Sequence, residues 1–494
     1  MTHDVQRPFT DRLRELAAAD PDRVALRAER REMTRGELEE DSDVRARELV
    51  HLGVKRGDHV VVMLPKGIEF VSVLLAAWKV GAVPVPLSTR LSDNELADML
   101  ELLNPTMVIG TEAEPAARFP RLPAGHRPSD HTEVTLDRGV VSPAWKAIGS
   151  GGSTGRPKII LTPVPAVLEA QLPVKGVLGM REGDTCVIPG PLSHNGPFMS
   201  LLQALLLGGR VVLTGRFDAE GLLRTVEREK ASWLYLVPTM MSRIWKLPED
   251  TRARYSLDTL HTVTHMGAPC PAWLKQAWME WLGSERLREV YTSTEGVVVF
   301  AAGGATWRKH PGTVGLPVGG EVQVRSAAGD VSPAGERGLI WVRRDPALGP
   351  SYAYLGAEAQ SDPDGWETVG DIGRLDGDGY LYVEDRESDM MLVGGSNVYP
   401  AEVEAALLDH PAVADACVIG LPDDDLGQAP HALVYAASDV DETVLSSHAR
   451  DRLALYKCPR SYEFVDAPLH DAAGKVRRGR LRAERVNTDG EAVR

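Results

Sequence analysis

The sequence GDHVVVMLPKGIEFVSVLLAAWKVGAVPVPL, residues 57–87, gives the strongest indication of the fold. Its apolar run HVVVMLP is typical of a buried strand, and residues 69–79 follow as a helical stretch. Residues 92–103 open with Ser92 and Glu95 at the spacing of a capping box, which indicates the start of a second helix. Strands and helices that alternate in this way predict an α/β protein built from βαβ units.

The same alternation of strands and helices continues through residues 210–238. After about residue 303 the pattern changes, because Gly- and Pro-rich turns separate short strands such as EVQVR and GYLYVED. This change predicts a small β subdomain over about 303–387. We therefore expect an α/β fold class with a large N-terminal domain over residues 1–387, in which βαβ-type layers are joined by this subdomain.

The last part of the chain, residues 388–494, is predicted to form a separate small α+β domain. A helix is expected over residues 400–408, with a proline at its start, where the missing N–H costs nothing. Strands are expected over residues 413–420 and 431–437, and a final helix is expected near 442–455. Ser388 is the expected domain boundary.

Composition excludes several classes of protein. The chain has 494 residues, a formal charge of −15 and 43% hydrophobic residues, so it is long enough for two to four domains of roughly 100 to 200 residues each. The acidic balance argues against binding to nucleic acids or anionic membranes, which require a basic surface, and favours a small-molecule partner. Four scattered cysteines indicate a reducing compartment. No membrane span or leader is recognisable, so we expect a cytoplasmic protein.

The loop GSGGSTGRPK, residues 149–158, is the first candidate for chemistry. Glycines let backbone N–H groups approach an anion, hydroxyl groups add donors, and Lys158 adds positive charge, so the loop is suited to phosphate. It is not a Walker A loop, and on its own it is equally typical of a flexible turn. GGSTG also matches the G-x-S-x-G nucleophile elbow of serine hydrolases, with Ser153 as the nucleophile.

Three further segments carry candidate residues. In YTSTEG, residues 291–296, a carboxylate at a strand end could hold Mg²⁺ and a tyrosine could stack on a base. Asp371 and Arg386 could hydrogen-bond a ribose diol. Lys475 follows a Gly turn in AAGKVRRGRLRAER. Taken singly, Glu295, Asp371 and Arg386 are more typical of ordinary surface side chains, whereas Lys475, directly after a Gly turn, is less easily explained in that way.

In their order along the chain, these segments resemble the adenylate-forming superfamily of acyl-CoA synthetases, peptide-synthetase adenylation domains and luciferases. The resemblance begins at about Phe70 and also includes PLSHNGPF, MGAPC, GTVGLPVGG and DRESDMMLVGGSNVYPAEVE, so it covers nearly the whole chain. GGSTGRPK together with PLSHNGPF is most similar to bacterial CoA ligases that act on fatty, bile-acid or aromatic acids. The order of the segments is far more specific than any single one.

The resemblance implies a role for each matching residue. The β- and γ-phosphates of ATP would be held by Gly151, Gly152, Ser153, Thr154 and Lys158. The adenosine would be enclosed by Gly267, Ala268, Pro269 and Tyr291 at its base and by Asp371 and Arg386 at its ribose. Three residues would be catalytic. Thr294 would contact the α-phosphate, Glu295 would bind Mg²⁺, and Lys475 would bridge the carboxylate and the α-phosphate. His194 would line the acid pocket.

The implied reaction has two half-reactions. A carboxylic acid attacks ATP, which forms an acyl adenylate and releases pyrophosphate, and the thiol of CoA then attacks the adenylate. Between the two steps the mobile C-terminal domain rotates about a hinge at Ser388, so that Gly394 and Gly395 lie along the path of the pantetheine chain. ATP, Mg²⁺ and CoA are therefore the expected cofactor and co-substrates.

The chain departs from the family pattern at several positions. Ser388 stands where the hinge usually carries Asp or Lys, and Gly151 and Gly152 stand where Ser-Gly is usual. Val369 replaces a Thr, and Thr292 replaces a Gly. No charged catalytic group is lost. PLSHNGPF lacks the Asp that binds an α-ammonium group, which argues against α-amino acids as substrates.

Other functions remain open from the sequence. The acyl group could pass to an acyl carrier protein or to an amine in place of CoA, or the enzyme could adenylate an unusual oxyacid such as nitrite. A serine hydrolase would use Ser153 but would leave Glu295, Asp371, Arg386 and Lys475 without a role. A non-catalytic nucleotide-binding protein is the remaining alternative.

Overall fold

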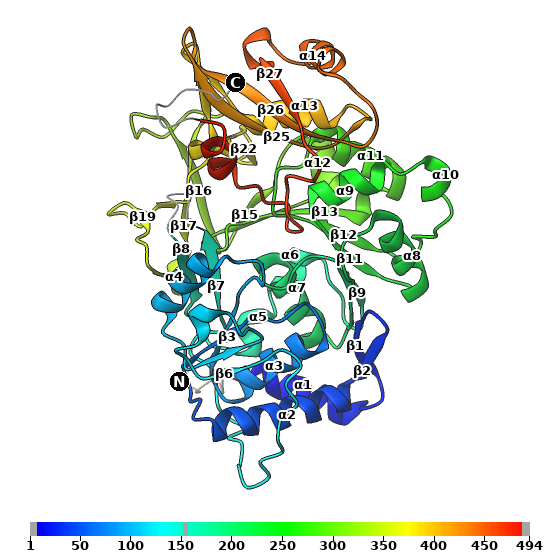
Figure 1. Cartoon of the computed structure of the whole chain (residues 1–494), viewed down its shortest axis with the longest axis vertical. Helices are drawn as coiled ribbons and strands as arrows, with labels where there is room; N and C mark the ends of the chain where they lie inside the picture. Colours follow the sequence, from blue (N-terminus) through cyan, green and yellow to red (C-terminus); the bar gives the residue numbers. More distant parts are fainter. Residues whose placement is uncertain (1–6, 152–156, 487–494) are drawn as a thin grey trace.

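The computed structural model describes residues 7–151 and 157–486, and it contains the expected α/β layers (Figure 1). The largest sheet has nine strands in the order β15-β14-β13-β12-β11-β9-β10-β1-β2. Its six central strands, from β13 to β1, are parallel, and the outer strands are antiparallel. In sheet order, the bounds are Leu316–Val318, Val299–Gly303, Leu287–Tyr291, Thr262–His265, Trp233–Leu236, Thr185–Ile188, Arg210–Leu213, Val24–Ala28 and Arg31–Thr34.

Helices connect successive strands of this sheet, as βαβ units require. Between β9 and β13 they are α7, α8, α9, α10 and α11, with bounds Asn195–Leu206, Ala219–Glu229, Pro238–Trp245, Glu249–Arg252 and Ala272–Leu282. Before β9 lie α1, α2, α5 and α6, with bounds Phe9–Ala19, Arg35–His51, Leu168–Gln171 and Val174–Leu178, and α12 (Gly304–Lys309) follows β14. The loops after β9, β12 and β13 meet at one edge of the sheet, because parallel strands end at the same side.

The quoted stretch forms part of a second, four-stranded parallel sheet in the order β4-β3-β5-β6. Its strands are Val83–Pro86, His59–Val62, Met107–Ile109 and Arg121–Leu122, and the helices α3 (Ile68–Lys79) and α4 (Asp93–Leu103) connect them. Val60 and Val62 belong to the large core, whereas Val61 and Met63 belong to a smaller core with α4. Both faces of β3 are therefore covered, which explains why its sequence is continuously apolar.

The capping box that the sequence predicts at α4 is present. Ser92 Oγ accepts from Glu95 N at 3.4 Å, and Glu95 Oε2 accepts from Ser92 N at 3.0 Å. A second capping box at α2, formed by Thr34 and Glu37, was not predicted from the sequence. These reciprocal bonds satisfy N–H groups that the first turn of a helix leaves free.

Two smaller sheets complete the part of the chain before residue 388. A three-stranded sheet joins β18 (Ala353–Leu355), β8 (Pro157–Thr162) and β7 (Lys146–Gly151). A six-stranded sheet contains β16, β17, β19, β20, β21 and β22, with bounds Gly320–Arg325, Gly338–Arg344, Gln360–Ser361, Glu367–Thr368, Asp371–Leu375 and Leu381–Arg386. This sheet begins at Gly320, because β15 still belongs to the nine-stranded sheet.

The C-terminal segment has its own sheet and its own core. The order is β24-β23-β26-β25, with β27 beside β26, and the bounds are Ser396–Val398, Met391–Val393, Gly427–Ala436, Val413–Asp423 and Ser461–Phe464. Three helices pack with it, α13 (Pro400–Leu408), α14 (Glu442–Arg450) and α15 (Arg478–Ala483). The bounds of α13 match the prediction. The expected helix to residue 455 was too long, since α14 ends at Arg450, and β25 and β26 are longer than predicted.

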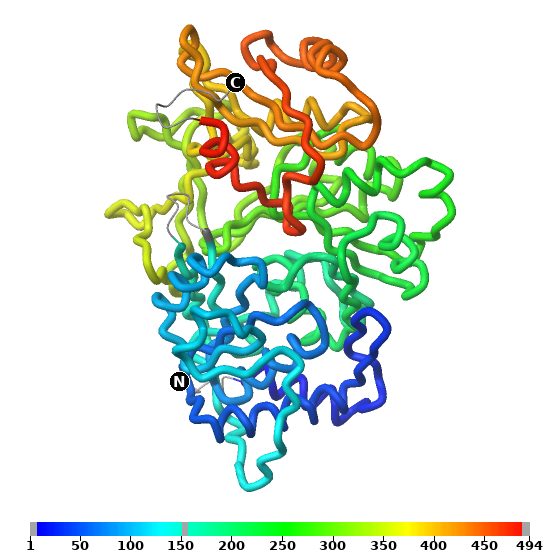
Figure 2. Tube along the Cα trace, in the orientation of Figure 1, coloured from blue at the N-terminus to red at the C-terminus, as the bar shows by residue number. Residues whose placement is uncertain are grey.

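Several contacts dock the C-terminal sheet against the nine-stranded part. Lys246 Nζ, at the end of α9, donates to Leu408 O at 2.8 Å and also to Val413 O. Trp273 Nε1 donates to Ala405 O at 3.3 Å. In Figure 2 the red segment of the trace reaches down from the C-terminal sheet toward the middle of the molecule. Among the described residues, no helix is both long and apolar enough to cross a membrane.

Candidate active site

The glycine-rich loop lies between the antiparallel strands β7 and β8. Ser150 pairs with Lys158, and Gly151 pairs with Pro157. The predicted phosphate ligands Gly152, Ser153 and Thr154 lie outside the described residues. Close packing explains the glycine at position 149, since a Cβ there would lie 2.8 Å from Leu87 Cδ2 and 2.9 Å from Met99 Sδ.

Lys158 and Glu295 meet at the end of this hairpin. Lys158 Nζ lies 3.1 Å from Glu295 Oε1 and donates to the hydroxyl of Tyr354 at 2.9 Å. The Tyr354 hydroxyl in turn donates to Glu295 Oε1 at 2.5 Å. Burial acts to raise the pKa of Glu295, but the hydrogen bond from Tyr354 and the charge of Lys158 outweigh it, so the pKa is lowered. Glu295 is therefore a buried, ionised carboxylate, which is the kind of oxygen ligand that Mg²⁺ binds.

Tyr354 was not identified from the sequence. It lies on β18, which pairs with β8 so that Tyr354 is opposite Ile160. Almost two hundred residues separate it from Lys158, and only the pairing of these two strands brings it to the site. Its neighbour Tyr352 points its hydroxyl elsewhere and donates to Glu367 Oε2 at 2.6 Å.

Asp371 and Arg386 face each other across the antiparallel strands β21 and β22. Arg386 Nε lies 3.2 Å from Asp371 Oδ1, and the Tyr291 hydroxyl donates to Asp371 Oδ2 at 2.5 Å. Burial raises the pKa of Asp371, although the charge of Arg386 and the bond from Tyr291 oppose this effect. The predicted ribose pair is thus assembled in the folded chain, and Tyr291 is tied to it.

The residues predicted to bind the adenine, the α-phosphate and Mg²⁺ lie in the loops at the carboxyl edge of the nine-stranded sheet. Gly267, Ala268 and Pro269 follow β12, and Thr294 and Glu295 follow β13. Gly267 has φ of 92°, a left-handed backbone conformation that favours glycine. A Cβ at Gly267 would lie 3.5 Å from Ala473 O, so this loop touches the C-terminal segment directly.

Lys475 reaches this edge from the C-terminal domain on a tight turn. Asp471 holds the turn, since its Oδ1 accepts from Lys475 N at 2.9 Å and from Ala473 N at 2.8 Å. Gly474 has φ of 75°, and a Cβ there would lie 3.3 Å from Val237 Cβ. The turn is therefore packed against Val237, which joins β11 to α9, and against the Gly267 loop.

The electrostatics show which groups surround Lys475. Burial lowers its pKa, the nearby charge of Arg386 lowers it further, and Asp471 and Glu295 act in the opposite direction. Burial and the charge of Lys475 lower the pKa of His194 to about 4, so this imidazole is neutral at pH 7. His194 is the N-cap residue of α7. The fold thus brings Lys475, Glu295, Arg386 and His194 into one site.

The remaining predicted residues lie near the domain junction. Ser388 is exposed in a short 3₁₀ turn, Glu387–Asp389, between β22 and β23. Gly394 and Gly395 form the turn between β23 and β24 with φ of 55° and 80°, a two-residue hairpin that requires glycine-like conformations. Gly394 N donates to Leu426 O within the C-terminal sheet, so in this orientation of the chain these glycines are held with that sheet.

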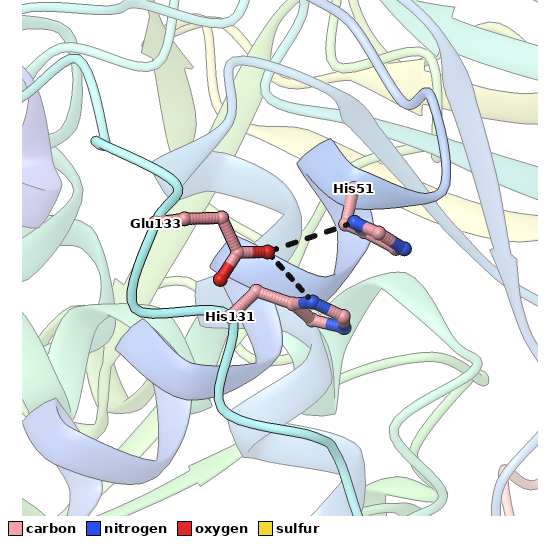
Figure 3. A group of neighbouring side chains, drawn as sticks. All are labelled: His51, His131 and Glu133. Atoms are coloured by element: carbon pink, nitrogen blue, oxygen red, sulfur yellow. Dashed lines mark hydrogen bonds and ion pairs between the residues drawn. The ribbon is translucent and has the colours of Figure 1, made fainter.

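A separate group of potential metal ligands lies on the surface, away from this site (Figure 3). Glu133 Oε1 lies 3.1 Å from His131 Nδ1 and 3.9 Å from His51 Nδ1. The two imidazole rings stack with centroids 3.9 Å apart and an angle of 13° between their planes. One potential ligand atom from each residue lies within 4.8 Å of the other two. Contact of the Glu133 carboxylate with both imidazoles is enough to explain this grouping.

Comparison with known proteins gives matches over most of the chain. A family model described as "AMP-binding enzyme" matches residues 13–353, and one described as "AMP-binding enzyme C-terminal domain" matches residues 402–475. A 2-succinylbenzoate–CoA ligase of Bacillus licheniformis is 31% identical over 485 residues, which cover 95% of this chain and 98% of that protein.

Two solved structures are similar along nearly their full length. The anthranilate CoA ligase AuaEII in complex with anthranoyl-AMP has a TM-score of 0.82 and 26% identity, and 97% of each chain is covered. The o-succinylbenzoate CoA synthetase MenE of Bacillus subtilis with ATP and a magnesium ion has a TM-score of 0.79 and 26% identity, with 96% of this chain and 99% of that chain covered.

Proposed function

This chain belongs to the AMP-binding enzyme family and is an AMP-forming acid–CoA ligase, and we propose that the acid it activates is an aromatic carboxylic acid. The enzyme uses ATP and Mg²⁺ to convert a carboxylic acid into an acyl adenylate with release of pyrophosphate, and it then transfers the acyl group to CoA. The names of both kinds of relative, 2-succinylbenzoate and anthranilate ligases, support an aromatic acid.

The roles that we propose for the individual residues rest mainly on one observation, that Lys475, Glu295 and Arg386 belong to the same site. Lys475 would stabilise the negative charge that builds up between the attacking carboxylate and the α-phosphate, with Thr294 beside it. His194, which is neutral, would lie against the acid and would not form an ion pair with the carboxylate that Lys475 binds. Asp371 and Arg386 would hold the ribose, and the loop from Gly267 to Pro269 would hold the adenine.

We assign the metal and the terminal phosphates to the group around Glu295. Its ionised carboxylate fits Mg²⁺, and Lys158 beside it, with the loop from Gly151 to Thr154, would bind the β- and γ-phosphates. Mg²⁺ bound there would neutralise phosphate charge. A serine hydrolase acting through Ser153 would have no use for this pairing of Lys158 with Glu295.

Tyr354→Phe tests the metal assignment. The substitution removes the hydroxyl that donates to Glu295, so the pKa of Glu295 should rise and the acid limb of the pH–rate profile should move to higher pH. Because hydrogen bonds to charged groups contribute about 1.5–3 kcal/mol, we expect roughly tenfold more Mg²⁺ to be needed for half-maximal pyrophosphate release. Tyr352→Phe is the matched control, since that hydroxyl donates to Glu367. Equal effects of the two substitutions would contradict the assignment.

The C-terminal domain, from about Ser388, is proposed to rotate between the two half-reactions. Its present orientation presents Lys475 to the site and is the one suited to adenylate formation. After rotation, Gly394 and Gly395 would face the site and leave room for the pantetheine chain of CoA. One site would then serve both half-reactions in turn.

Lys246→Met tests whether the docking contacts hold the adenylate-forming orientation. Lys246 donates to the backbone carbonyls of Leu408, at the end of α13, and Val413, at the start of β25, so its loss leaves these acceptors without a cationic donor. We expect adenylate formation to slow about tenfold, the factor that one hydrogen bond to a charged group provides. Transfer to CoA from a supplied adenylate should be unaffected. Lys175→Met, at an exposed lysine of α6, is the control, and unchanged adenylate formation in Lys246→Met would exclude the docking role.

The cellular compartment proposed for the enzyme is the cytoplasm. Its four cysteines are free thiols, and Cys186, Cys417 and Cys458 are buried. Unpaired thiols are typical of proteins in a reducing environment.

Pyrophosphate release across a panel of acids tests the proposed substrate class. The panel contains benzoic, anthranilic and 2-succinylbenzoic acids, linear fatty acids and a bile acid, each measured with and without CoA. We expect the highest kcat/KM with an aromatic acid. A higher kcat/KM for a fatty or bile acid would overturn the aromatic assignment. If turnover requires a carrier protein or an amine in place of CoA, that molecule is the acceptor of the acyl group.

A further inference from the structure

Lys146 is a buried lysine in contact with Asn195, the residue that follows His194 at the start of α7. It lies at the start of β7, directly before the glycine-rich loop, and is 3% exposed. Its Nζ donates to Asn195 Oδ1 and lies 4.5 Å from the centre of the Trp145 ring. Within residues 7–151 and 157–486, no carboxylate lies within ion-pair distance of Lys146.

Lys79 and Lys275, which are buried to a similar extent, have carboxylate partners. Lys79 lies 2.9 Å from Glu39 and 2.7 Å from Asp43, and Lys275 pairs with Glu289. Buried charges are normally paired in this way, because removing an ammonium group from water is costly. At Lys146 the same cost lowers the pKa to about 7. The ring of Trp145 and one amide oxygen compensate only part of it, so this position is suited to an anion that the described protein does not supply.

Asn195 connects Lys146 to the acid pocket. A lysine can only donate, so the amide of Asn195 must turn its oxygen toward Lys146, which leaves the amide nitrogen to donate in another direction. Asn195 is the first residue of α7, and the positive end of the helix dipole adds to the charge of Lys146.

The residues on either side of Asn195 show which side chains surround the start of α7. The preceding residue, His194, is close enough to Lys475 for that charge to lower its pKa. A Cβ on the following residue, Gly196, would lie 2.9 Å from both Met266 Sδ and the Tyr235 hydroxyl. His194 and Asn195 are therefore consecutive residues at the start of α7, in the region where the acid is placed by the proposed function.

We propose that the acid substrate carries a second carboxylate, which pairs with Lys146 and the amide nitrogen of Asn195. The proposal rests on the acid–CoA ligase function and on the placement of the acid beside His194. It narrows the aromatic acids to those with a second anionic substituent at the far end of the pocket.

The chain offers a matched comparison in Lys66. Its Nζ donates to Pro189 O at 2.5 Å, at the other end of the segment that leads to Asn195, and burial lowers its pKa to about 8. Its partner is a backbone carbonyl, so its role is to fix the segment. Lys66→Met should therefore affect all acids alike, whereas Lys146→Met should act on acids that carry the second carboxylate.

The experiment compares kcat/KM for pyrophosphate release between matched acids. Benzoic acid is paired with the three benzenedicarboxylic acids and 2-succinylbenzoic acid, and linear monocarboxylic acids of four to ten carbons are paired with dicarboxylic acids of equal length. We expect the wild-type enzyme to favour at least one dicarboxylic acid over its partner. Lys146→Met should lower that ratio about 10- to 100-fold, the factor expected for a hydrogen-bonded charge, and Lys146→Arg should recover part of it.

Asn195→Asp tests the same charge without removing the lysine. The new carboxylate would pair with Lys146 and repel the substrate's second carboxylate, so the preference for dicarboxylic acids should again be lost. This variant decides the question if Lys146→Met does not fold, as thermal melting would reveal.

Three results would overturn the proposal. They are a wild-type preference for the monocarboxylic acid in every pair, an unchanged ratio in Lys146→Met or Asn195→Asp, and an equal fall of the ratio in Lys66→Met. If the ratio fails in this way while monocarboxylic acids still release pyrophosphate, the ligase function stands and only the second carboxylate is excluded. Absence of pyrophosphate release with every acid, with and without CoA, would instead overturn the ligase function itself.

Discussion

Lys475→Ala is expected to slow adenylate formation by about 10²- to 10³-fold, the cost of removing one positioned donor from a site of developing negative charge. The charges of Arg386 and Glu295 both act on the pKa of its ammonium group, and the proposed function places the α-phosphate among these three charges. Transfer of the acyl group from a supplied adenylate to CoA should be largely unchanged, because the proposed rotation moves Lys475 away from the site. The measurement is single-turnover pyrophosphate release beside acyl-CoA formation from synthetic adenylate.

Arg480→Ala is the control for Lys475→Ala. Arg480 belongs to the same C-terminal segment and is paired with Glu484 of its own helix at 2.7 Å. It should therefore leave both half-reactions unchanged. An equal loss of both half-reactions in Lys475→Ala would contradict the assignment of Lys475 to the first step.

The sequence was sufficient to predict the layers of the fold and most of the charged site. Continuous apolar runs such as residues 59–64 are typical of buried strands in a sheet that is covered on both faces, and β3 is such a strand. Asp371, Arg386, Glu295 and Lys475 stand in motifs whose order is specific, so their meeting could be expected without coordinates. The local apolar pattern predicts the strand, whereas the meeting of the four charged residues follows from the family resemblance that the order of the motifs carries.

The contacts between distant segments could not be predicted from the sequence. Tyr354 reaches Glu295 only because β18 pairs with β8 in one register, and a shift by one residue would turn the side chain to the other face of the sheet. Lys246 gave no sequence signal, because its acceptors are backbone carbonyls of the C-terminal domain. Lys146 also gave no sequence signal, because only the folded structure shows that it is buried without a carboxylate partner. The orientation of the C-terminal domain also has no signature in the chain, because in the proposed mechanism one sequence serves two orientations.

Ser388→Pro is expected to separate the two half-reactions. The short turn at Glu387–Asp389 is a 3₁₀ turn, in which φ of about −50° to −70° is normal, so proline at position 388 suits the present orientation. Proline also biases the preceding residue, Glu387, toward extended conformations, and it fixes the dihedral angle about which a rotation here would occur. Adenylate formation should therefore persist with a modest loss. CoA-dependent turnover should fall by more than about 10²-fold, the factor that corresponds to a proline misfit of about 3 kcal/mol.

The matched control for this hinge variant is Ser388→Ala, which removes the weak hydroxyl contact to Asp389 at 3.3 Å and leaves φ free. It should behave like the wild-type enzyme in both half-reactions. Pyrophosphate release in a single turnover measures the first half-reaction, and steady-state acyl-CoA formation reports on both. If proline at position 388 leaves CoA-dependent turnover intact, the pivot lies elsewhere in the segment that joins β22 to β23, or the C-terminal domain does not rotate between the steps. A loss of adenylate formation as large as the loss of CoA-dependent turnover would show instead that the present orientation itself requires Glu387 in its helical conformation.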